Sequence, residues 1–165
     1  VMVKEVGAGV GPDVAQRLFD AGVHAVDIAG LGGTNWTRIE AARREDAALF
    51  EPFLDWGLPT VDALRAVRSA CPNARLIASG GVENGLDAAK ALWLGAALVS
   101  IAGPVLRALT GDGRGTPNSD AAVHVIESWK SQLRLALFLT GAPDLQSFAG
   151  KPGHVGGSYQ RALPR

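Results

Sequence analysis

The sequence has little cysteine and no surplus of charge of either sign. It contains one cysteine, and its 16 basic residues balance its 16 acidic residues. A single thiol, Cys71, excludes an internal disulfide, and burial as a small apolar side chain is the simpler interpretation of it. Because no net charge attracts a polyanion, we expect neither a nucleic-acid partner nor an anionic membrane partner.

Long hydrophobic runs are also absent, since no segment reaches the roughly 18 apolar residues that a membrane-spanning helix needs. The first residues, Val1 to Val6, contain no basic leader followed by an apolar signal core, so we expect a cytoplasmic protein. What is present is an apolar fraction of 47% against 19% charged residues. Over 165 residues, this balance is typical of one packed globular domain.

Short β-rich segments alternate with amphipathic helices over the first two thirds of the chain, in the order βαβαβαβα. Each pair of expected strands is separated by a helix-bearing connection, which favours parallel neighbours in one sheet. The expected strands lie near residues 1–6, 24–29, 75–79 and 97–102. The expected helices begin at or are capped by Pro12, Thr60, Asn84, Pro104 and Ser119, and two of them end at Gly22 and Gly95.

An internal repeat supports this order. Residues 7–30 laid over residues 80–103 without a gap are identical at seven of 24 positions. Each copy has a glycine loop, a helix and a strand that ends in Ile-Ala-Gly, as expected of successive units in one parallel sheet. Chance matching of common alanine and glycine residues is the alternative.

Four parallel strands cannot close a barrel of eight, and an open sheet would leave two unpaired edges. We therefore interpret residues 1–110 as half of an α/β fold, the TIM (β/α)8 barrel, present either as a fragment or as a protomer that another chain completes. Residues 111–150 are expected to form a helical extension with one apolar face, and residues 151–165 a flexible tail.

Two glycine-containing loops at strand ends could bind a phosphate. Residues 79–85, Ser-Gly-Gly-Val-Glu-Asn-Gly, follow an expected strand and open a helix, and residues 102–104, Ala-Gly-Pro, follow the next strand. Glycine lets the backbone approach a phosphate closely, and free N–H groups at a helix start stabilise the anion. In TIM barrels a phosphate often binds after the last two strands. A plain tight turn is the alternative for either loop alone.

Lys4 and Asp27 are charged residues inside otherwise apolar expected strands, where an unpartnered charge is costly. We expect both to point into the barrel and to pair, the alternatives being a lysine that reaches solvent and a purely structural aspartate. Thr34 follows the second strand in a glycine loop. The three histidines, His24, His124 and His154, lack metal-ligand spacing and are expected at the surface or at helix ends.

The four tryptophans are expected to pack, and Trp36, beside the Thr34 loop, is the one that could contact a ligand. No nucleophile elbow or P-loop motif is present in the sequence. We identify no catalytic residue and no metal ligand from the residues alone.

Taken in order, six segments resemble type 2 isopentenyl-diphosphate delta-isomerase, an FMN-dependent TIM-barrel family. The resemblance covers about residues 1–150 and corresponds to the C-terminal half of that barrel, strands five to eight. The segments are residues 3–7 (VKEVG), 30–36 (GLGGTNW), 55–60 (DWGLPT), 78–87 (ASGGVENGLD), 102–104 (AGP) and 138–142 (FLTGA).

The resemblance implies an isomerase of isoprenoid biosynthesis that interconverts isopentenyl and dimethylallyl diphosphate, uses FMN, NADPH and Mg2+, and is a homo-oligomer when full length. It implies that the metal ligand and most substrate contacts lie in the other half, so that this chain alone is inactive. The implied FMN-binding positions are Lys4 at the flavin, Ala29, Thr34, the phosphate loop Gly80, Gly81, Val82 and Glu83, and the second phosphate contact Ala102 with Gly103.

Two positions depart from the family pattern. Ala29 stands where a flavin-contacting serine is usual, and Glu83 stands where an arginine is common. Backbone N–H groups can still hold a phosphate beside Glu83, although its carboxylate would repel the anion.

Three alternatives remain. A 2-hydroxy-acid oxidase would place a histidine at Leu31, and the inosine-monophosphate dehydrogenase class would need a cysteine in the loop of residues 32–34. The third alternative is a non-catalytic fragment that at most binds phosphate.

Overall fold

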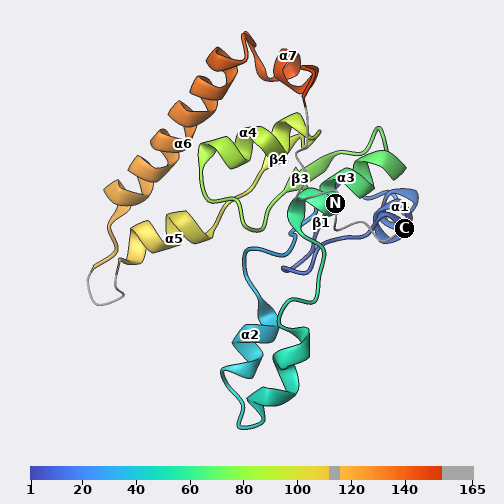
Figure 1. The fold of residues 1–165 in the computed structure, drawn as a ribbon, viewed down its shortest axis with the longest axis vertical. Helices are drawn as coiled ribbons and strands as arrows, with labels where there is room; N and C mark the ends of the chain where they lie inside the picture. Colours follow the sequence, from blue (N-terminus) through green and yellow to red (C-terminus); the bar gives the residue numbers. More distant parts are fainter. Residues whose placement is uncertain (112–115, 154–165) are drawn as a thin grey trace.

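The computed structural model describes residues 1–111 and 116–153 and contains one four-stranded sheet (Figure 1). The strands are β1 (Met2–Lys4), β2 (Ala25–Asp27), β3 (Leu76–Ala78) and β4 (Leu98–Val99). They lie in sequence order, and every neighbouring pair is parallel. The expectation of parallel neighbours is confirmed. The strands are shorter than expected because the β-rich pattern extends into the loops at either end.

Helices connect the strands and also follow them in the chain. The connecting helices are α1 (Pro12–Asp20), α3 (Thr60–Ala70) and α4 (Gly85–Trp93). After β4 come α5 (Gly103–Thr110), α6 (Ser119–Leu139) and α7 (Leu145–Ala149). The expected tail lies outside the described residues from position 154 onward, as do residues 112–115 of the loop after α5.

The internal repeat corresponds to a repeated structure. Helices α1 and α4 are both nine residues long and occupy the same place in the two copies. Each is followed by a glycine with positive φ, Gly22 at 85° and Gly95 at 100°, as a helix C-terminus requires. The unit β1-α1-β2 is therefore repeated as β3-α4-β4.

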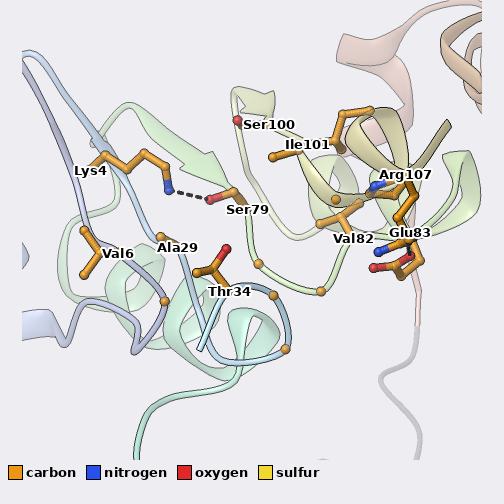
Figure 2. Close-up of a pocket in the computed structure, with 18 residues that line it drawn as sticks. Lys4, Val6, Ala29, Thr34, Ser79, Val82, Glu83, Ser100, Ile101 and Arg107 are labelled. Atoms are coloured by element: carbon orange, nitrogen blue, oxygen red, sulfur yellow. Dashed lines mark hydrogen bonds and ion pairs between the residues drawn. The ribbon is translucent and has the colours of Figure 1, made fainter. Parts of the chain in front are cut away.

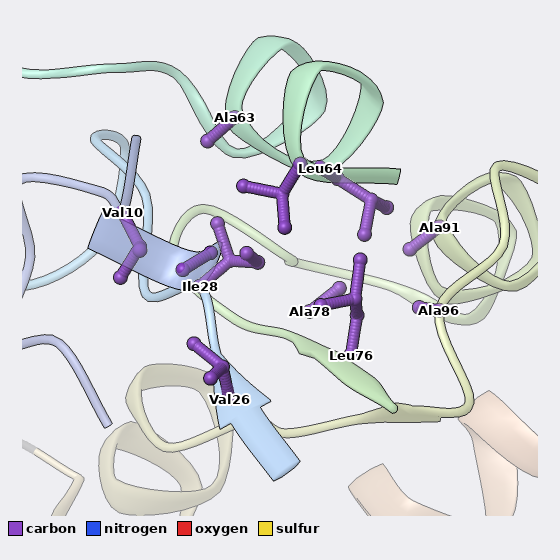
Figure 3. Close-up of a cluster of buried hydrophobic side chains, with 11 residues drawn as sticks. Val10, Val26, Ile28, Ala63, Leu64, Leu76, Ala78, Ala91 and Ala96 are labelled. Carbon is purple, nitrogen blue, oxygen red and sulfur yellow. The ribbon is translucent and has the colours of Figure 1, made fainter. Parts of the chain in front are cut away.

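The main hydrophobic core lies between the sheet and its connecting helices (Figure 3). Strands β2 and β3 are buried along their whole length, whereas the edge strands β1 and β4 are partly exposed. Met2 on β1 and Leu98 on β4 are 58% and 59% exposed. The core cluster comprises Val10, Ala15, Val26, Ile28, Ala63, Leu64, Val67, Leu76, Ala78, Ala91 and Ala96.

A second apolar cluster joins α4, α6 and α7. Ala89 of α4, Ala136 of α6 and Phe148 of α7 are buried in it, and Leu133 and Leu137 of α6 pack against it. Part of the expected apolar face of α6 therefore packs as predicted. Another part does not, because Ile126 on the same face is 44% exposed.

Two expected helix caps are wrong by one residue. The N-cap of α3 is Pro59, and Thr60 is the first helical residue, so its hydroxyl is free to bond elsewhere. The N-cap of α6 is Asn118, whose side chain accepts from the Ala121 N–H, and Ser119 again lies inside the helix. The Asn84 cap of α4 is confirmed by its bond from the Asp87 N–H at 2.9 Å.

The long connection between β2 and α3 contains two helices that the sequence pattern did not indicate, α2 (Trp36–Ala41) and the 3-10 helix η1 (Ala47–Phe53). They project away from the sheet (Figure 1) and contact each other. Residues 32–57, which include both helices, form an excursion from the sheet. Where it joins the sheet, the Leu31 N–H donates to the Leu58 carbonyl at 2.8 Å, and Leu31 forms a parallel bridge with Pro59. Among the described residues, no helix is both long and apolar enough to cross a membrane.

Candidate functional site

A cavity of about 430 Å³ lies at the carboxyl ends of the strands (Figure 2). The sheet ends form one side of it, and the glycine loops and the start of α5 form the other. Every residue implied by the sequence resemblance lines this one cavity. These residues are Lys4, Ala29, Thr34, Gly80, Gly81, Val82, Glu83, Ala102 and Gly103.

At one end of the cavity, Lys4 and Asp27 form the expected pair. The Lys4 Nζ atom lies 3.7 Å from the Asp27 Oδ2 atom, and the Lys4 side chain is 52% exposed whereas that of Asp27 is 4% exposed. The buried Asp27 carboxylate also accepts from the Ser79 hydroxyl at 2.6 Å, and Lys4 reaches the Ser79 oxygen at 3.4 Å. This network orients the ammonium group toward the cavity, and the prediction that the two residues pair is confirmed.

Ala29 has an unusual backbone conformation. Its φ of 40° is positive, which costs an L-residue about 1–2 kcal/mol, and its side chain is buried. The Ala29 N–H donates to the Asp27 Oδ1 atom at 3.2 Å, so the same carboxylate holds both this strained residue and Ser79. The side chain that this residue presents to the cavity wall is a methyl group, which carries no hydrogen-bonding atom.

The loop after β3 packs closely against the loop after β2. A Cβ atom on Gly80 would overlap the Gly30 backbone, and one on Gly81, whose φ is 71°, would lie 3.1 Å from the Gly32 backbone. The Thr60 hydroxyl, freed from capping, donates to the carbonyls of Ser79 and Gly80 at 2.9 and 2.6 Å. Glycine is thus required here for close contact between the two loops.

Unpaired backbone N–H groups remain in this loop. Among the described residues, none accepts a hydrogen bond from the N–H of Gly81 or Val82. Across the cavity, Ala102 is the N-cap of α5 and Gly103 is its first residue, so the first N–H groups of this helix also lack helical partners. Two sets of free N–H groups and a helix dipole therefore face one space, and this arrangement fits a phosphate group.

Arg107 is a lining residue that the sequence reasoning missed. Its Nη2 atom donates to the Glu83 Oε2 atom, so the carboxylate expected to repel a phosphate is paired with a cation. Figure 2 shows this pair on the opposite side of the cavity from Lys4. The spacing along α5 could have revealed it: Arg107 lies one helical turn after Gly103, so the two residues are on the same face of the helix.

Glu5, beside the cavity lysine, organises the loop after β1. Its Oε2 atom accepts from the N–H groups of Gly7, Ala8 and Gly9 at 2.6, 2.6 and 3.0 Å. Partial burial acts to raise the pKa of this carboxyl, but the hydrogen bonds from the backbone outweigh it and hold the pKa below its ordinary value. The ionised side chain therefore stabilises a loop that contributes Gly7 to the cavity wall.

This arrangement predicts a pH dependence of stability. The folded-state pKa of Glu5 lies below the unfolded value of about 4.3, so the carboxylate stabilises the fold above that pH. The contribution is lost as the pH falls through the folded-state pKa. We expect Glu5→Gln to lower the free energy of unfolding by about 1 kcal/mol at pH 7 and to lose less stability than wild type on acidification. Urea unfolding at pH 7 and at about pH 3, well below the unfolded-state pKa, measures this, and exposed Glu51→Gln is the control. Equal losses in Glu5→Gln and wild type would contradict it.

Other candidates lie away from the cavity. Trp36 is 57% exposed and does not line it, and Trp56, expected to pack, is 72% exposed on the excursion. His24 and His124 are exposed, as expected, whereas His154 lies outside the described residues. Cys71 is buried, as expected. Within residues 1–111 and 116–153, no group of three His, Cys, Asp or Glu side chains could hold a metal ion.

Comparison with known proteins identifies the family. The sequence pattern of the FMN-dependent dehydrogenases matches residues 1–154. The chain belongs to this family. The chain is also 53% identical over 148 residues to an isopentenyl-diphosphate delta-isomerase of Stutzerimonas stutzeri and 47% identical over 154 residues to one of Xanthobacter autotrophicus. The resemblance to isopentenyl-diphosphate isomerases is therefore confirmed.

The matches span only part of the length of those relatives. The matches cover 88% and 92% of this chain but only 41% and 43% of the two relatives. The chain thus spans less than half the length of the curated relatives it matches.

Two solved structures illustrate the likeness in fold. A lactate oxidase of Pediococcus acidilactici has a TM-score of 0.67 at 22% identity, covering 91% of this chain and 35% of that one. A mandelate oxidase variant, solved with a monooxide FMN adduct, has a TM-score of 0.65 at 21% identity, covering 90% of this chain and 40% of that one. At such low identity these likenesses show only the fold, that of TIM-barrel flavoenzymes.

Proposed function

We propose that this chain is the FMN-binding half of an enzyme that interconverts isopentenyl and dimethylallyl diphosphate. The observation that carries the proposal is the single cavity in which all the implied flavin positions meet, including Lys4 at one end and two glycine loops at the other. The family membership supports FMN as the cofactor, and the names of the relatives support the substrate pair.

The two ends of the cavity differ chemically, since Lys4 lies at one end and free backbone N–H groups lie at the other. FMN likewise has a ring at one end and a phosphate at the other. The phosphate would be held by the free N–H groups of Gly81 and Val82 and by the start of α5 at Gly103. The isoalloxazine ring would lie toward Lys4, with Thr34 between the two ends. When bound and reduced with NADPH as electron donor, FMN supplies proton transfer at the allylic carbons of the substrate without net redox change.

The role of Lys4 in this proposal is electrostatic. A fixed ammonium group near the ring stabilises the negative charge that the flavin gains on reduction. Asp27 holds the ammonium group in place through the ion pair and is itself held by Ser79. Because Asp27 is buried and Lys4 is half exposed, the positive end of this pair is the one that faces the cavity.

The domain organisation is part of the proposal. Residues 1–110 would be strands five to eight of a TIM barrel and residues 111–150 a helical extension of it. The two open sheet edges and the exposed Met2 and Leu98 support completion of the barrel by further strands. In this proposal the missing half supplies the Mg2+ ligand and most substrate contacts, the chain alone is inactive, and the complete enzyme is a cytoplasmic homo-oligomer with neither nucleic-acid nor membrane partner.

A chimeric enzyme tests this proposal. The segment of the Stutzerimonas relative that this chain does not match would be joined ahead of residue 1. We expect the chimera to retain FMN through gel filtration and to convert isopentenyl diphosphate in the presence of NADPH and Mg2+. This chain alone and the relative's segment alone should not catalyse the conversion.

The outcomes separate the alternatives. A chimera that retains flavin but does not isomerise the substrate would favour another FMN-dependent reaction. A folded chimera that retains no flavin would favour a non-catalytic phosphate-binding fragment and overturn the proposal.

A further inference from the structure

The pair formed by Arg107 and Glu83 lies at the phosphate end of the cavity and has no evident structural purpose. The two side chains are 64% and 51% exposed, and an ion pair this exposed contributes little to stability. Yet both line the cavity. Because both side chains line the cavity, they can contact a ligand that binds there.

The guanidinium group of Arg107 lies between the two glycine loops. Its Nη2 atom donates to Glu83 in the first loop, and its Nη1 atom lies 3.0 Å from the place that a Cβ atom on Gly103 would occupy in the second. A guanidinium is planar and carries several N–H donors, so one nitrogen can bind a carboxylate while others bind an anion. The Arg107 donors beside Gly103 are thus next to the free N–H groups of α5.

We propose that Arg107 is the phosphate-binding cation of this site and that Glu83 positions it. This inference rests on the proposed FMN site, whose phosphate it assigns to Arg107. Among the described residues that line the cavity, the basic side chains are Lys4 and Arg107, and Lys4 is engaged by Asp27 at the other end. The positive charge at the phosphate end is thus supplied from α5.

The proposal gives Glu83 two opposing effects. Its carboxylate holds the guanidinium of Arg107 in place, and its negative charge weakens the attraction of the neutralised pair for an anion. Glutamine at this position keeps an acceptor oxygen for Arg107 and removes the charge. FMN, which carries the phosphate, should respond to these changes, whereas riboflavin, which lacks the phosphate, should not.

The test is a titration of the 165-residue chain, and of the chimera described above, with FMN and with riboflavin, followed by flavin fluorescence. We expect Arg107→Gln to weaken FMN binding about tenfold and to change riboflavin binding less than about twofold, since a charge-assisted hydrogen bond is lost. Glu83→Gln should strengthen FMN binding about threefold and leave riboflavin unchanged. The affinity of Arg107→Gln for FMN should also depend less steeply on salt concentration than that of wild type.

The exposed pair of Arg38 and Asp55 provides the matched control, because it has the same chemistry, with 3.3 Å between its charged atoms, and lies outside the cavity lining. Arg38→Gln should change neither affinity. Equal effects of Arg107→Gln on FMN and riboflavin, or no effect on either, would overturn the role of Arg107 while leaving the flavin site intact. If wild type bound neither flavin in either protein, the proposed function would fail and this assignment with it.

Discussion

Replacing Gly81 with valine is expected to abolish flavin retention by the chimera described above. The Gly81 φ of 71° disfavours any L-residue by about 1–2 kcal/mol, and an added Cβ would lie 3.1 Å from the Gly32 backbone. Displacing the loop would remove the N–H groups of Gly81 and Val82 from the phosphate position. Two hydrogen bonds to a charged group, at about 1.5–3 kcal/mol each, correspond to at least about a hundredfold in affinity.

The structure provides a control that separates backbone strain from crowding. Gly22 has a similar φ of 85°, but a Cβ atom added there would have nothing within 4 Å. Gly22→Val should therefore lose stability through strain alone and keep its flavin, whereas Gly81→Val should lose both. Flavin absorbance after gel filtration and urea unfolding, both measured on the chimera, give the two readouts. Flavin retained by Gly81→Val as well as by wild type would place the phosphate elsewhere.

Lys4→Ala should leave the phosphate bound and weaken mainly the reduced cofactor. Oxidised flavin is neutral at the ring, so its affinity should change less than about twofold, whereas reduced flavin should bind about tenfold more weakly. This difference lowers the two-electron reduction potential of the bound flavin by about 30 mV. Spectrophotometric reduction of the flavin-loaded chimera measures the shift.

Two further variants show whether the charge of Lys4 is responsible. Lys4→Arg keeps a cation beside Asp27, so the reduction potential of its flavin should stay close to that of wild type. Lys130→Ala removes an exposed lysine that pairs with Glu127 on α6 and should leave the reduction potential unchanged. Stability should fall by only about 1 kcal/mol in Lys4→Ala, because Asp27 still accepts from Ser79 and from the Ala29 N–H. An unchanged reduction potential in Lys4→Ala would show that Lys4 does not lie near the flavin ring.

The parts of the fold that sequence predicted are those with strong local determinants. Pro12 can occupy only the first turn of a helix, Asn84 caps through its own side chain, and Gly22 and Gly95 adopt positive φ at helix ends. Thr60 misled the prediction because threonine is also a common N-cap. Its hydroxyl instead bonds to Ser79 and Gly80, which are distant in sequence.

The sequence predicted the glycine loops of the candidate site better than the pairing of its charged side chains. The glycine loops are visible as motifs, and the resemblance gathered residues as far apart as Lys4 and Gly103 into one cavity. The pairing of Glu83 with Arg107 was not predicted, because the two residues lie on different elements and only the fold brings them together. Glu5 was missed for a related reason, since its partners are backbone N–H groups that no residue type reveals.

The two ends of the excursion after β2 lie side by side. Because Leu31 bonds to Leu58 and bridges to Pro59, the segment between them is a loop with its ends already fastened together. For such a loop, doubling the length costs only about 0.6 kcal/mol of closure entropy. Its helices α2 and η1 can therefore be lengthened, shortened or exchanged for others while the register of β2 against β3 is preserved. A change of this segment would therefore alter the outer surface of the molecule and leave the residues that line the cavity in place.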